Sequence, residues 1–479
     1  MYRTWQHREI FEYNRTMLEL SIAAYRQYLL TGRMTTRALV AFYLERIQRF
    51  DGALASIICV NPDAIHLAEA CDDYLRQTGK LIGSLHGVPV LVKDNIETAG
   101  MPTTAGSLSL EGFSTGKDAD LVRRLKNAGA IILAKTNLHE FAVWGESISS
   151  IKGQTHNPYD LTRTPGGSSG GTGAALAANF GLVGIGTDTI NSIRSPSSAN
   201  NLVGIRPGVG LVSADGIVPY SLTQDTAGPM ARCVVDAAAV LEVIAVREMP
   251  EDTALGTPRI GVLRSFFGTE PVNEEVNNIM AGVMDELRKM GVELVEIEEP
   301  LQTGDLVSNV SVHLYDLKAH LNAYLEAANA PYPSIDAVLR SGLHHPGIKD
   351  NLMYANQLDT SSSEYHERLE KRALLQEKLK ALFAANRIEA LFFPHQQQLV
   401  CKVGASQLQR NGALAAITGF PSVCMPGGFS APTPEAPVGV PVGFELLGLP
   451  ASERRLIAIS SQYERLFPKR KAPIEADWL

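Results

Sequence analysis

"TPGGSSGGTGAALAANFGLVGIGTDTINSIRSP", residues Thr164 to Pro196, is the stretch that decides how this chain is interpreted. It places two adjacent serines, Ser168 and Ser169, inside a run of glycines, and a third serine, Ser192, follows later within "GTDTINSIR". Glycines let a backbone turn tightly and approach its neighbours closely. Serines with a purely structural role do not need such glycine-rich surroundings, so the stretch raises the question of whether these serines are catalytic.

Taken alone, the segment Gly166–Gly173 allows three interpretations. As a phosphate cradle it fits G-x-x-x-x-G, but Thr172 stands where a P-loop requires lysine. As a nucleophile elbow it fits G-x-S-x-G around Ser168, but the preceding "NPYDLTRTP" contains two prolines and no apolar strand, and no later histidine has a recognisable setting. As a flexible turn it would simply precede the small-residue helix "TGAALAAN". The segment by itself leaves all three open.

Outward from this stretch, helical and strand patterns alternate along the chain. The spacing of apolar residues predicts helices and buried strands in turn, which favours an α/β fold with a mixed central β-sheet covered by helices on both faces. We predict a single domain over residues 1–479, with a helical cap or variable substrate region at about 301–387 and a proline-rich loop leading into a strand over 427–448. The clearest predicted helices are 21–32, 35–50 and 273–291, and the clearest strands are 87–95, 131–134, 259–263 and 292–297.

The composition narrows the class of protein. The 479 residues are 45% hydrophobic and 20% charged, and the net charge of −8 without a basic run argues against nucleic acid as a partner. Five scattered cysteines without C-x-x-C spacing predict reduced, mostly buried thiols in a cytoplasmic protein. The charged N-terminus predicts no signal peptide, and the apolar windows, such as 237–246, are too short to cross a membrane. No histidine cluster has ligand spacing, so we expect neither a metal nor a cofactor.

Several long motifs, in order, carry a resemblance to a known family. "LHGVPVLVKDN", "NPYDLTRTPGGSSGGTGAALAA" and "GTDTINSIRSP" are followed by "VGIRPGVGLVSADGIVPYSLTQDTAGPMAR", "ITGFPSVCMPGGF" and "GVPVGFELLG". Together they resemble the amidase signature family of serine hydrolases, and the resemblance covers most of the chain. Because it rests on many motifs in order, it is far more specific than any single glycine pattern.

The resemblance implies a triad of serine, serine and lysine without histidine. It assigns the base to Lys93 of "VKDN", the bridging residue to Ser168 on a cis peptide, and the nucleophile to Ser192. The chemistry is consistent, because a serine hydroxyl attacks only when a base takes its proton, and lysine is such a base only when burial lowers its pKa. Lys93 follows the apolar run 88–92, as a residue at a buried strand end would, but a lysine after a strand is usually solvated at the surface. The family motif around Lys93 is what favours burial here. A hydroxyl both donates and accepts, so Ser168 suits a proton relay.

The same resemblance implies the surroundings of the triad. Asp188, Arg194 and Ser169 would support the loop, and for Asp188 and Arg194 the alternative is a buried salt bridge without a chemical role. Family position also suggests substrate contacts in "EFAVWGES" and near residue 224. The implied oxyanion hole consists of the backbone N–H groups of Thr189, Ile190, Asn191 and Ser192, and the substrate-contact candidates are Trp144, Gln224 and Asp225.

Three classes of function stay open. The first is an amidase that hydrolyses a small linear carboxylic amide through an acyl-enzyme. The second is an acyltransferase that uses the same triad to form an amide, and the third is a catalytically impaired, amidase-like binding protein. No feature for transfer RNA or a partner subunit stands out, which favours a free-standing enzyme, monomeric or homodimeric, whose partner is a small amide.

One departure from the family pattern bears on these classes. Ile190 and Asn191 stand where "GTDTGGSIR" would have two glycines. A β-branched residue at positive φ is costly, so we predict that Ile190 has negative φ and that the path of the loop is kept. The two side chains would then narrow the pocket and make it selective, whereas a collapsed loop would make the chain a pseudo-enzyme.

Overall fold

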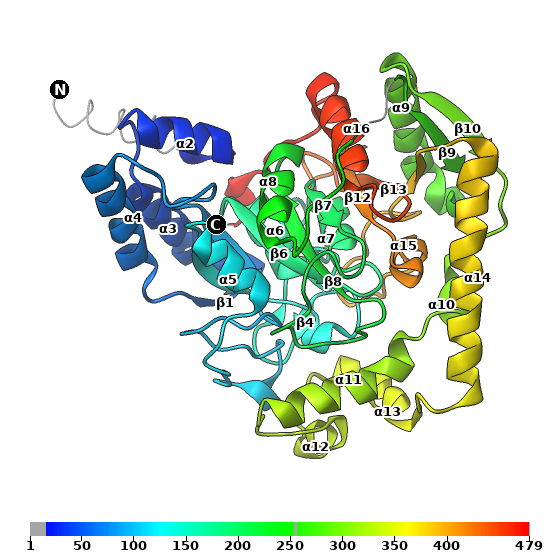
Figure 1. The fold of residues 1–479 in the computed structure, drawn as a ribbon, viewed down its shortest axis with the longest axis horizontal. Coiled ribbons are helices and arrows are strands. Elements are labelled where there is room, and N and C mark those ends of the chain that lie inside the picture. The colour runs from blue at the N-terminus through cyan, green and yellow to red at the C-terminus, as the bar shows by residue number, and fades with distance from the viewer. Residues whose placement is uncertain (1–15, 253–255, 479) are drawn as a thin grey trace.

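The computed structural model describes residues 16–252 and 256–478. The charged N-terminal residues 1–15, from which we predict that there is no signal peptide, lie outside this range. Its centre is a mixed sheet of eleven strands, drawn in the middle of Figure 1. In spatial order the strands are β1 (Ile57–Val60), β3 (Ile131–Thr136), β2 (Pro89–Lys93), β6 (Val183–Asp188), β8 (Thr226–Ala231), β7 (Val203–Arg206), β12 (Ser422–Phe429), β13 (Pro441–Leu447), β11 (Ala390–Pro394), β9 (Arg259–Leu263) and β10 (Glu293–Ile297).

Parallel and antiparallel pairs alternate in blocks. The pairs β3–β2–β6 and β11–β9–β10 are parallel, whereas the middle of the sheet from β6 to β11 is antiparallel. A separate two-stranded sheet consists of β4 (Ile148–Ser149) and β5 (Gly153–Gln154). The helices are α2 (Ile22–Leu30), α3 (Thr36–Leu54), α4 (Ala64–Thr78), α5 (Asp120–Asn127), α6 (Gly170–Ala177), α7 (Arg194–Ala199), α8 (Val234–Ile244), α9 (Glu274–Lys289), α10 (Thr303–Asn309), α11 (His313–Ala327), α12 (Ile335–Ser341), α13 (Lys349–Gln357), α14 (Ser363–Asn386), α15 (Ala413–Thr418) and α16 (Glu453–Leu466).

Helices cover both faces of this sheet. In Figure 1, α8 and α16 lie in front of it, where they contact each other and the strands β7, β8 and β12. Helices α6 and α7 also contact each other, with α6 against β2 and β6 and α7 against β7, β12 and β13. Strands β2, β3 and β6 are buried along their whole length, as expected for strands covered on both sides. The predicted α/β fold with a mixed sheet is confirmed.

Individual predictions agree at the elements with the strongest local signals. Helix α2 begins after Ser21, whose side chain accepts a hydrogen bond from the N–H of Ala24. Strands β9 and β10 lie where the sequence predicts them. The loop predicted from residue 427 is wrong at its start, because Gly428 and Phe429 still pair with β13 and extend β12.

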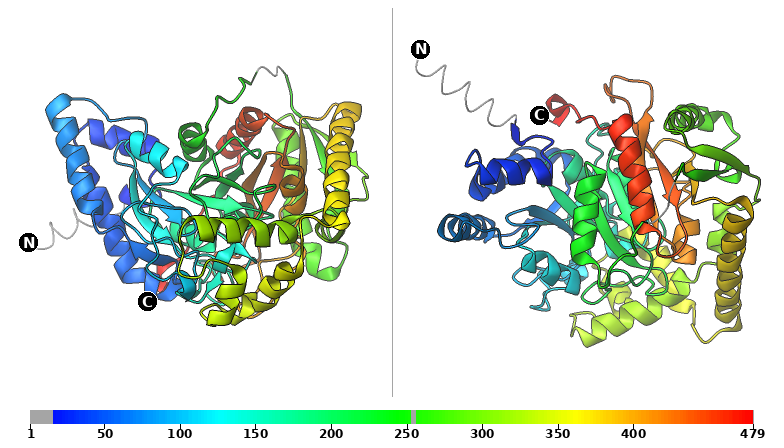
Figure 2. Two further views of the ribbon diagram at one scale, coloured as in Figure 1. Left: turned by 60° about the horizontal axis from the view of Figure 1, so that its bottom comes forward. Right: turned by 45° about the horizontal axis from the view of Figure 1, so that its top comes forward.

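The region 301–387 is helical, but it forms two separate groups. Helices α11, α12 and α13 lie together at the bottom of Figure 1, and α14 runs along one side of the molecule, opposite α3 and α4; the left view of Figure 2 shows the same separation. The first group packs on an apolar cluster that includes Phe141 and Val218, whereas α14 packs against α15. Whether the region acts as a cap stays a prediction.

Two predictions made from composition, on the cysteines and on membrane-spanning segments, can be compared with the structure. All five cysteines are free thiols, with Cys71 and Cys424 buried and the other three half-buried. Over residues 16–252 and 256–478, no helix combines the length and the apolar character needed to span a bilayer.

Candidate active site

Lys93 is the last residue of β2, and its side chain is 0% exposed. Its Nζ donates hydrogen bonds to Ser168 Oγ at 2.7 Å and to Thr187 Oγ1 at 2.8 Å. Burial lowers the pKa of Lys93 to about 7, although the negative charges of Asp188 and Asp225 act to raise it. The expectation of a buried lysine at a strand end is confirmed, and a large share of these side chains is neutral at neutral pH.

The glycine-rich segment holds Ser168 in a tightly packed turn. The peptide bond between Gly167 and Ser168 is cis. A Cβ on Gly171 would lie 2.2 Å from the carbonyl oxygen of Asn137, so only glycine fits there. No strand precedes Ser168, which rules out the nucleophile elbow at this position. The glycines serve close backbone packing, with α6 beginning directly after the two serines.

Ser192 lies in the turn between β6 and α7. Ser192 lines a cavity, although the residue is only 7% exposed. The carbonyl oxygen of Ser192 accepts a hydrogen bond from the N–H of Ser169 at 3.2 Å, which joins the two serine turns. The Ser169 hydroxyl donates to the carbonyl oxygen of Thr187 at 3.1 Å and accepts from the N–H of Thr187 at 3.2 Å. Ser169 therefore fixes the end of β6 beside the turn.

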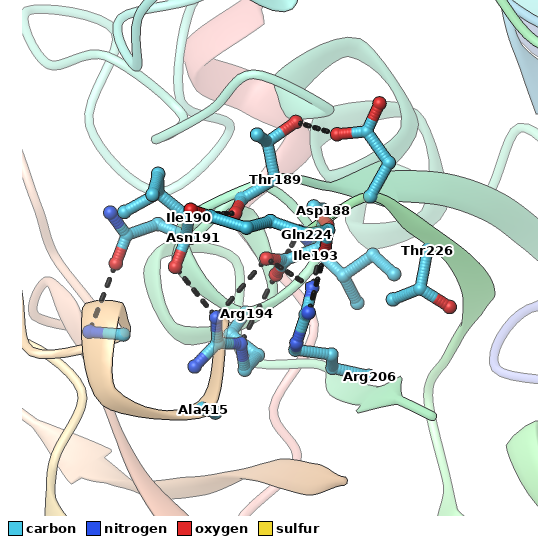
Figure 3. Close-up of polar contacts among 12 residues, drawn as sticks. Asp188, Thr189, Ile190, Asn191, Ile193, Arg194, Arg206, Gln224, Thr226 and Ala415 are labelled. Atoms are coloured by element: carbon cyan, nitrogen blue, oxygen red, sulfur yellow. Dashed lines mark hydrogen bonds and ion pairs between the residues drawn. The ribbon is translucent and has the colours of Figure 1, made fainter. Parts of the chain in front are cut away.

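A buried cluster of charges lies beneath this turn, as Figure 3 shows for most of its members. Arg194 donates to both carboxylate oxygens of Asp188 at 3.1 Å and to Glu445 Oε2 at 2.7 Å, and Arg206 donates to Asp188 Oδ1 at 3.0 Å. Burial alone would raise the pKa of both carboxyl groups. The two arginines nevertheless hold the pKa of Asp188 well below its usual range, and Arg194 with His395 lowers the pKa of Glu445 to about 2. Two cations thus balance two anions.

Sequence reasoning missed two members of this cluster. Arg206 and Glu445 end or interrupt apolar strand segments, "VGIR" and "GFELLG". A charged residue inside a buried strand needs a partner of opposite charge. The positions of Arg206 and Glu445 within apolar segments could therefore have indicated that each is part of a buried ion pair. The sequence did not show which charges would pair.

The turn that precedes Ser192 keeps an open path. Neither Ile190 nor Asn191 is among the described residues with positive φ, so the prediction of negative φ for Ile190 is confirmed. The carbonyl oxygen of Ile190 accepts from Arg194 Nη2 at 2.7 Å, and Asn191 Oδ1 accepts from the N–H of Gly412 at 3.0 Å. Within the described chain, the backbone N–H groups of residues 189–192 have no hydrogen-bond partner. Asn191 therefore braces the turn and leaves these donors available.

A cavity of about 500 Å³ opens above this turn, a size suited to a small molecule. Trp144, 41% exposed, forms part of its wall and donates from Nε1 to Glu146 Oε1 at 2.8 Å. The other lining residues are contributed mainly by the turn, by the start of the region 301–387 and by a loop near residue 400. They are Ala142, Val143, Thr189, Ile190, Asn191, Ser192, Tyr220, Gln302, Thr303, Gly304, Val307, Ser308, His313, Gln397, Gln407, Leu408, Gln409 and Arg410.

Gln224 and Asp225 do not line this cavity. Gln224 Nε2 donates to the carbonyl oxygen of Thr189 at 3.2 Å, and Asp225 accepts from Thr189 Oγ1 at 2.5 Å. Both side chains hold the turn from behind, and their contact with substrate stays a prediction. The wall residues of 302–308 lie within the region 301–387 that the sequence predicts to be a substrate region. Gln397 and residues 407–410 were missed, because polar residues in a loop carry no periodic signal.

The described residues contain no group of three or more His, Cys, Asp or Glu side chains placed to hold a metal ion. The expectation that no metal is needed stays a prediction.

Comparison with known proteins identifies the family to which this arrangement belongs. The family model described as Amidase matches residues 38–457. The chain is 32% identical to a glutamyl-tRNA(Gln) amidotransferase subunit of Myxococcus xanthus over 96% of this chain and 99% of the relative, and 33% identical to a probable amidase of Arabidopsis thaliana over 92% and 88%. The crystal structure of native peptide amidase from Stenotrophomonas maltophilia superposes with a TM-score of 0.85 at 35% identity, covering 95% of this chain and 99% of that one. The chain therefore belongs to the amidase signature family and is an amide-hydrolysing enzyme.

Proposed function

We propose that this enzyme hydrolyses a linear carboxylic amide through an acyl-enzyme on Ser192, with Lys93 as the base and Ser168 as the relay between them. The observation that carries the proposal is the buried Lys93, whose Nζ lies 2.7 Å from Ser168 Oγ and whose pKa is lowered to about 7. A neutral amine beside a hydroxyl is able to accept a proton at neutral pH.

The proposed reaction balances its protons within this group. The hydroxyl of Ser192 attacks the amide carbonyl and gives its proton to Ser168, whose own proton passes to Lys93. The resulting ammonium returns the proton by the same route to the leaving nitrogen, and the C–N bond breaks. A water molecule then attacks the acyl-enzyme with the same proton path, which releases the carboxylic acid and restores Ser192.

The oxyanion hole of this proposal is the turn 189–192. Its backbone N–H groups have no hydrogen-bond partner within the described chain, and the four residues line the cavity. In other hydrolases one such donor contributes about 2.7–4 kcal/mol to the transition state. The alternative, an impaired binding protein with a collapsed hole, is disfavoured because Asn191 braces the turn through Gly412 instead of filling it.

A fluorophosphonate probe tests the proposal directly. We expect the probe to label the wild-type enzyme at Ser192, as located by peptide mass spectrometry, and Ser192→Ala to remain unlabelled. The control Ser195→Ala alters a buried serine of α7 and should still be labelled. Wild-type protein that stays unlabelled while hydrolysing amides would contradict the assignment of the nucleophile.

Transfer of the acyl group to an amine is a second candidate, because several relatives are named as amidotransferase subunits. The same acyl-enzyme would then react with an amine in place of water. Product analysis with and without added hydroxylamine separates the two. A hydroxamate that forms faster than the acid at millimolar hydroxylamine would favour transfer, and acid as the main product favours hydrolysis.

A further inference from the structure

The charge of the cavity wall sets it apart from the rest of the site. Among the lining residues Arg410 is the one side chain with a permanent charge, and no Asp or Glu lines the cavity. His313 also lines it, but burial lowers its pKa to about 4, so the imidazole is neutral at pH 7. The cavity therefore presents one net positive charge to whatever enters it.

Arg410 is packed in place but has no ionic partner. A Cβ on Gly145 would lie 1.7 Å from Arg410 Nη1, so the guanidinium lies directly against the backbone there, and its Cζ is 5.8 Å from the centroid of the Trp144 ring. Within residues 16–252 and 256–478, Arg410 makes neither a salt bridge nor a side-chain hydrogen bond. Glu146 acts on it electrostatically, but that carboxylate binds Trp144 Nε1 and the N–H of Gln407.

This makes Arg410 unlike the other arginines near the site. Arg194 and Arg206 are surrounded by carboxylates and carbonyl oxygens. A guanidinium has five N–H donors in a planar fork that matches a carboxylate in two parallel hydrogen bonds. In Arg410 this fork is held at the wall of a cavity, with its donors unused by the protein.

The position of Arg410 is also tied to the nucleophile turn. Arg410 pairs with Gln396 in an isolated antiparallel bridge, and two residues later the N–H of Gly412 binds Asn191 Oδ1 at 3.0 Å. Asn191 is next to Ser192. The backbone that carries Arg410 is thereby held at a fixed place relative to the serine, which a residue that selects substrates requires.

We propose that Arg410 binds a carboxylate of the substrate, so that the preferred substrates are linear amides that carry a free carboxylate at a distance from the scissile bond. The inference rests on the proposed function of Ser192 and names the substrate class of the same site. The amide of Gln409 lines the same wall, whereas the Nε2 groups of Gln397 and Gln407 donate to Asn411 Oδ1 and to the carbonyl oxygen of Leu408. Arg410 is a specificity residue in this proposal and takes no part in proton transfer.

Matched pairs of substrates test the proposal. Glutaramate and its neutral isostere 5-oxohexanamide place the charge on the acyl half, and N-acetyl-β-alanine and N-(3-oxobutyl)acetamide place it on the amine half. In at least one pair we expect wild-type kcat/KM to favour the carboxylate by about 10- to 100-fold, as for a charge-assisted hydrogen bond in a confined site. Arg410→Gln should reduce that ratio to about one, and Arg410→Lys should retain part of it.

Lys402→Gln is the matched control, because Lys402 is an exposed cation of the same loop and does not line the cavity. It should leave the ratio unchanged. An unchanged ratio in Arg410→Gln, or no preference for a carboxylate in either pair for the wild type, would overturn the proposal. Arg410→Lys keeps the test decisive if thermal unfolding shows that Arg410→Gln does not fold.

Binding separates this proposal from the proposed mechanism. Isothermal titration of Ser192→Ala with glutaramate and with N-acetyl-β-alanine measures recognition without turnover. We expect one of them to bind at least about tenfold more weakly when Arg410→Gln is added to Ser192→Ala. Failure of the fluorophosphonate probe to label the wild-type enzyme would count against the mechanism alone. Equal binding by Ser192→Ala and by Ser192→Ala/Arg410→Gln would count against Arg410 alone.

Discussion

The floor of the site and its wall are built on different principles. The floor, defined here as Lys93, Ser168, Asp188 and Arg194, is fully buried, and every one of these polar side chains has a partner in the protein. The wall, defined as those residues of 302–313 and 397–410 that line the cavity, presents polar side chains to it, and the Arg410 guanidinium makes no salt bridge or hydrogen bond there among the described residues. Charges buried before substrate arrives must be paired, whereas a surface that recognises substrate keeps its donors open. In our proposals, the chemistry depends on the floor and the selectivity on the wall.

The largest effects should follow from changing the proposed triad, which consists of Lys93 and Ser168 in the floor and of Ser192 at the cavity. We expect Lys93→Ala, Ser168→Ala and Ser192→Ala each to lower kcat/KM by about a thousand-fold or more while the protein still folds. Leu408→Ala, a change in the wall, should alter kcat/KM by less than about tenfold on the same amide. Near-normal turnover by Ser192→Ala would contradict the assigned nucleophile, and near-normal turnover by Lys93→Ala or Ser168→Ala would show that floor and wall are not divided in this way.

The charge balance of the floor gives the next largest effect. Glu445→Gln keeps the shape of the side chain but leaves Arg194 and Arg206 to share Asp188. We expect a loss of about 3–5 kcal/mol in the free energy of unfolding, measured by urea denaturation. The exposed pair of Glu296 with Arg264 provides a control, for which Glu296→Gln should cost less than about 1 kcal/mol. Equal losses for the two variants would contradict the buried role.

The pH dependence tests whether Lys93 is the base. In the proposed mechanism, neutral Lys93 is the active form, and burial lowers the pKa of Lys93 to about 7. Activity should therefore rise as pH increases through about 7 and level off above it, and kcat/KM should fall about tenfold per pH unit below about 6. Initial rates on one amide from about pH 5 to about pH 9 provide the measurement. An optimum at acidic pH would indicate a carboxylate or histidine base.

The smallest effect concerns the residues that join floor and wall. Ile190 packs against an apolar cluster, Asn191 accepts a hydrogen bond from Gly412, and both residues line the cavity, which we expect them to narrow. The double variant Ile190→Gly/Asn191→Gly should broaden the substrate range, with relative kcat/KM values across a panel of amides changing by a few-fold, up to about tenfold. Fluorophosphonate labelling serves as the control for an intact nucleophile. An unchanged range would show that these side chains do not shape selectivity.

The sequence by itself determined the parts whose signal is local. Apolar spacing predicted the α/β alternation, because helix and strand periods are properties of short segments. The motifs around Lys93, Ser168 and Ser192 carried the family resemblance, and the same motifs placed Asp188 and Arg194 beside the serine. Negative φ at Ile190 also followed from the side chain alone.

The tertiary structure decided what depends on distant partners. Glu445 reaches Arg194 across 251 residues of sequence, and Gly412 reaches Asn191 across 221. Such pairs are set by the order of strands in the sheet and by the paths of long loops, for which no periodic pattern exists in the sequence. Gln224 and Asp225, expected near substrate, were found behind the turn, and the unpaired Arg410 was found at the wall. Which polar groups are paired and which stay open is a property of packing, because it depends on every neighbour that the fold brings within hydrogen-bond distance.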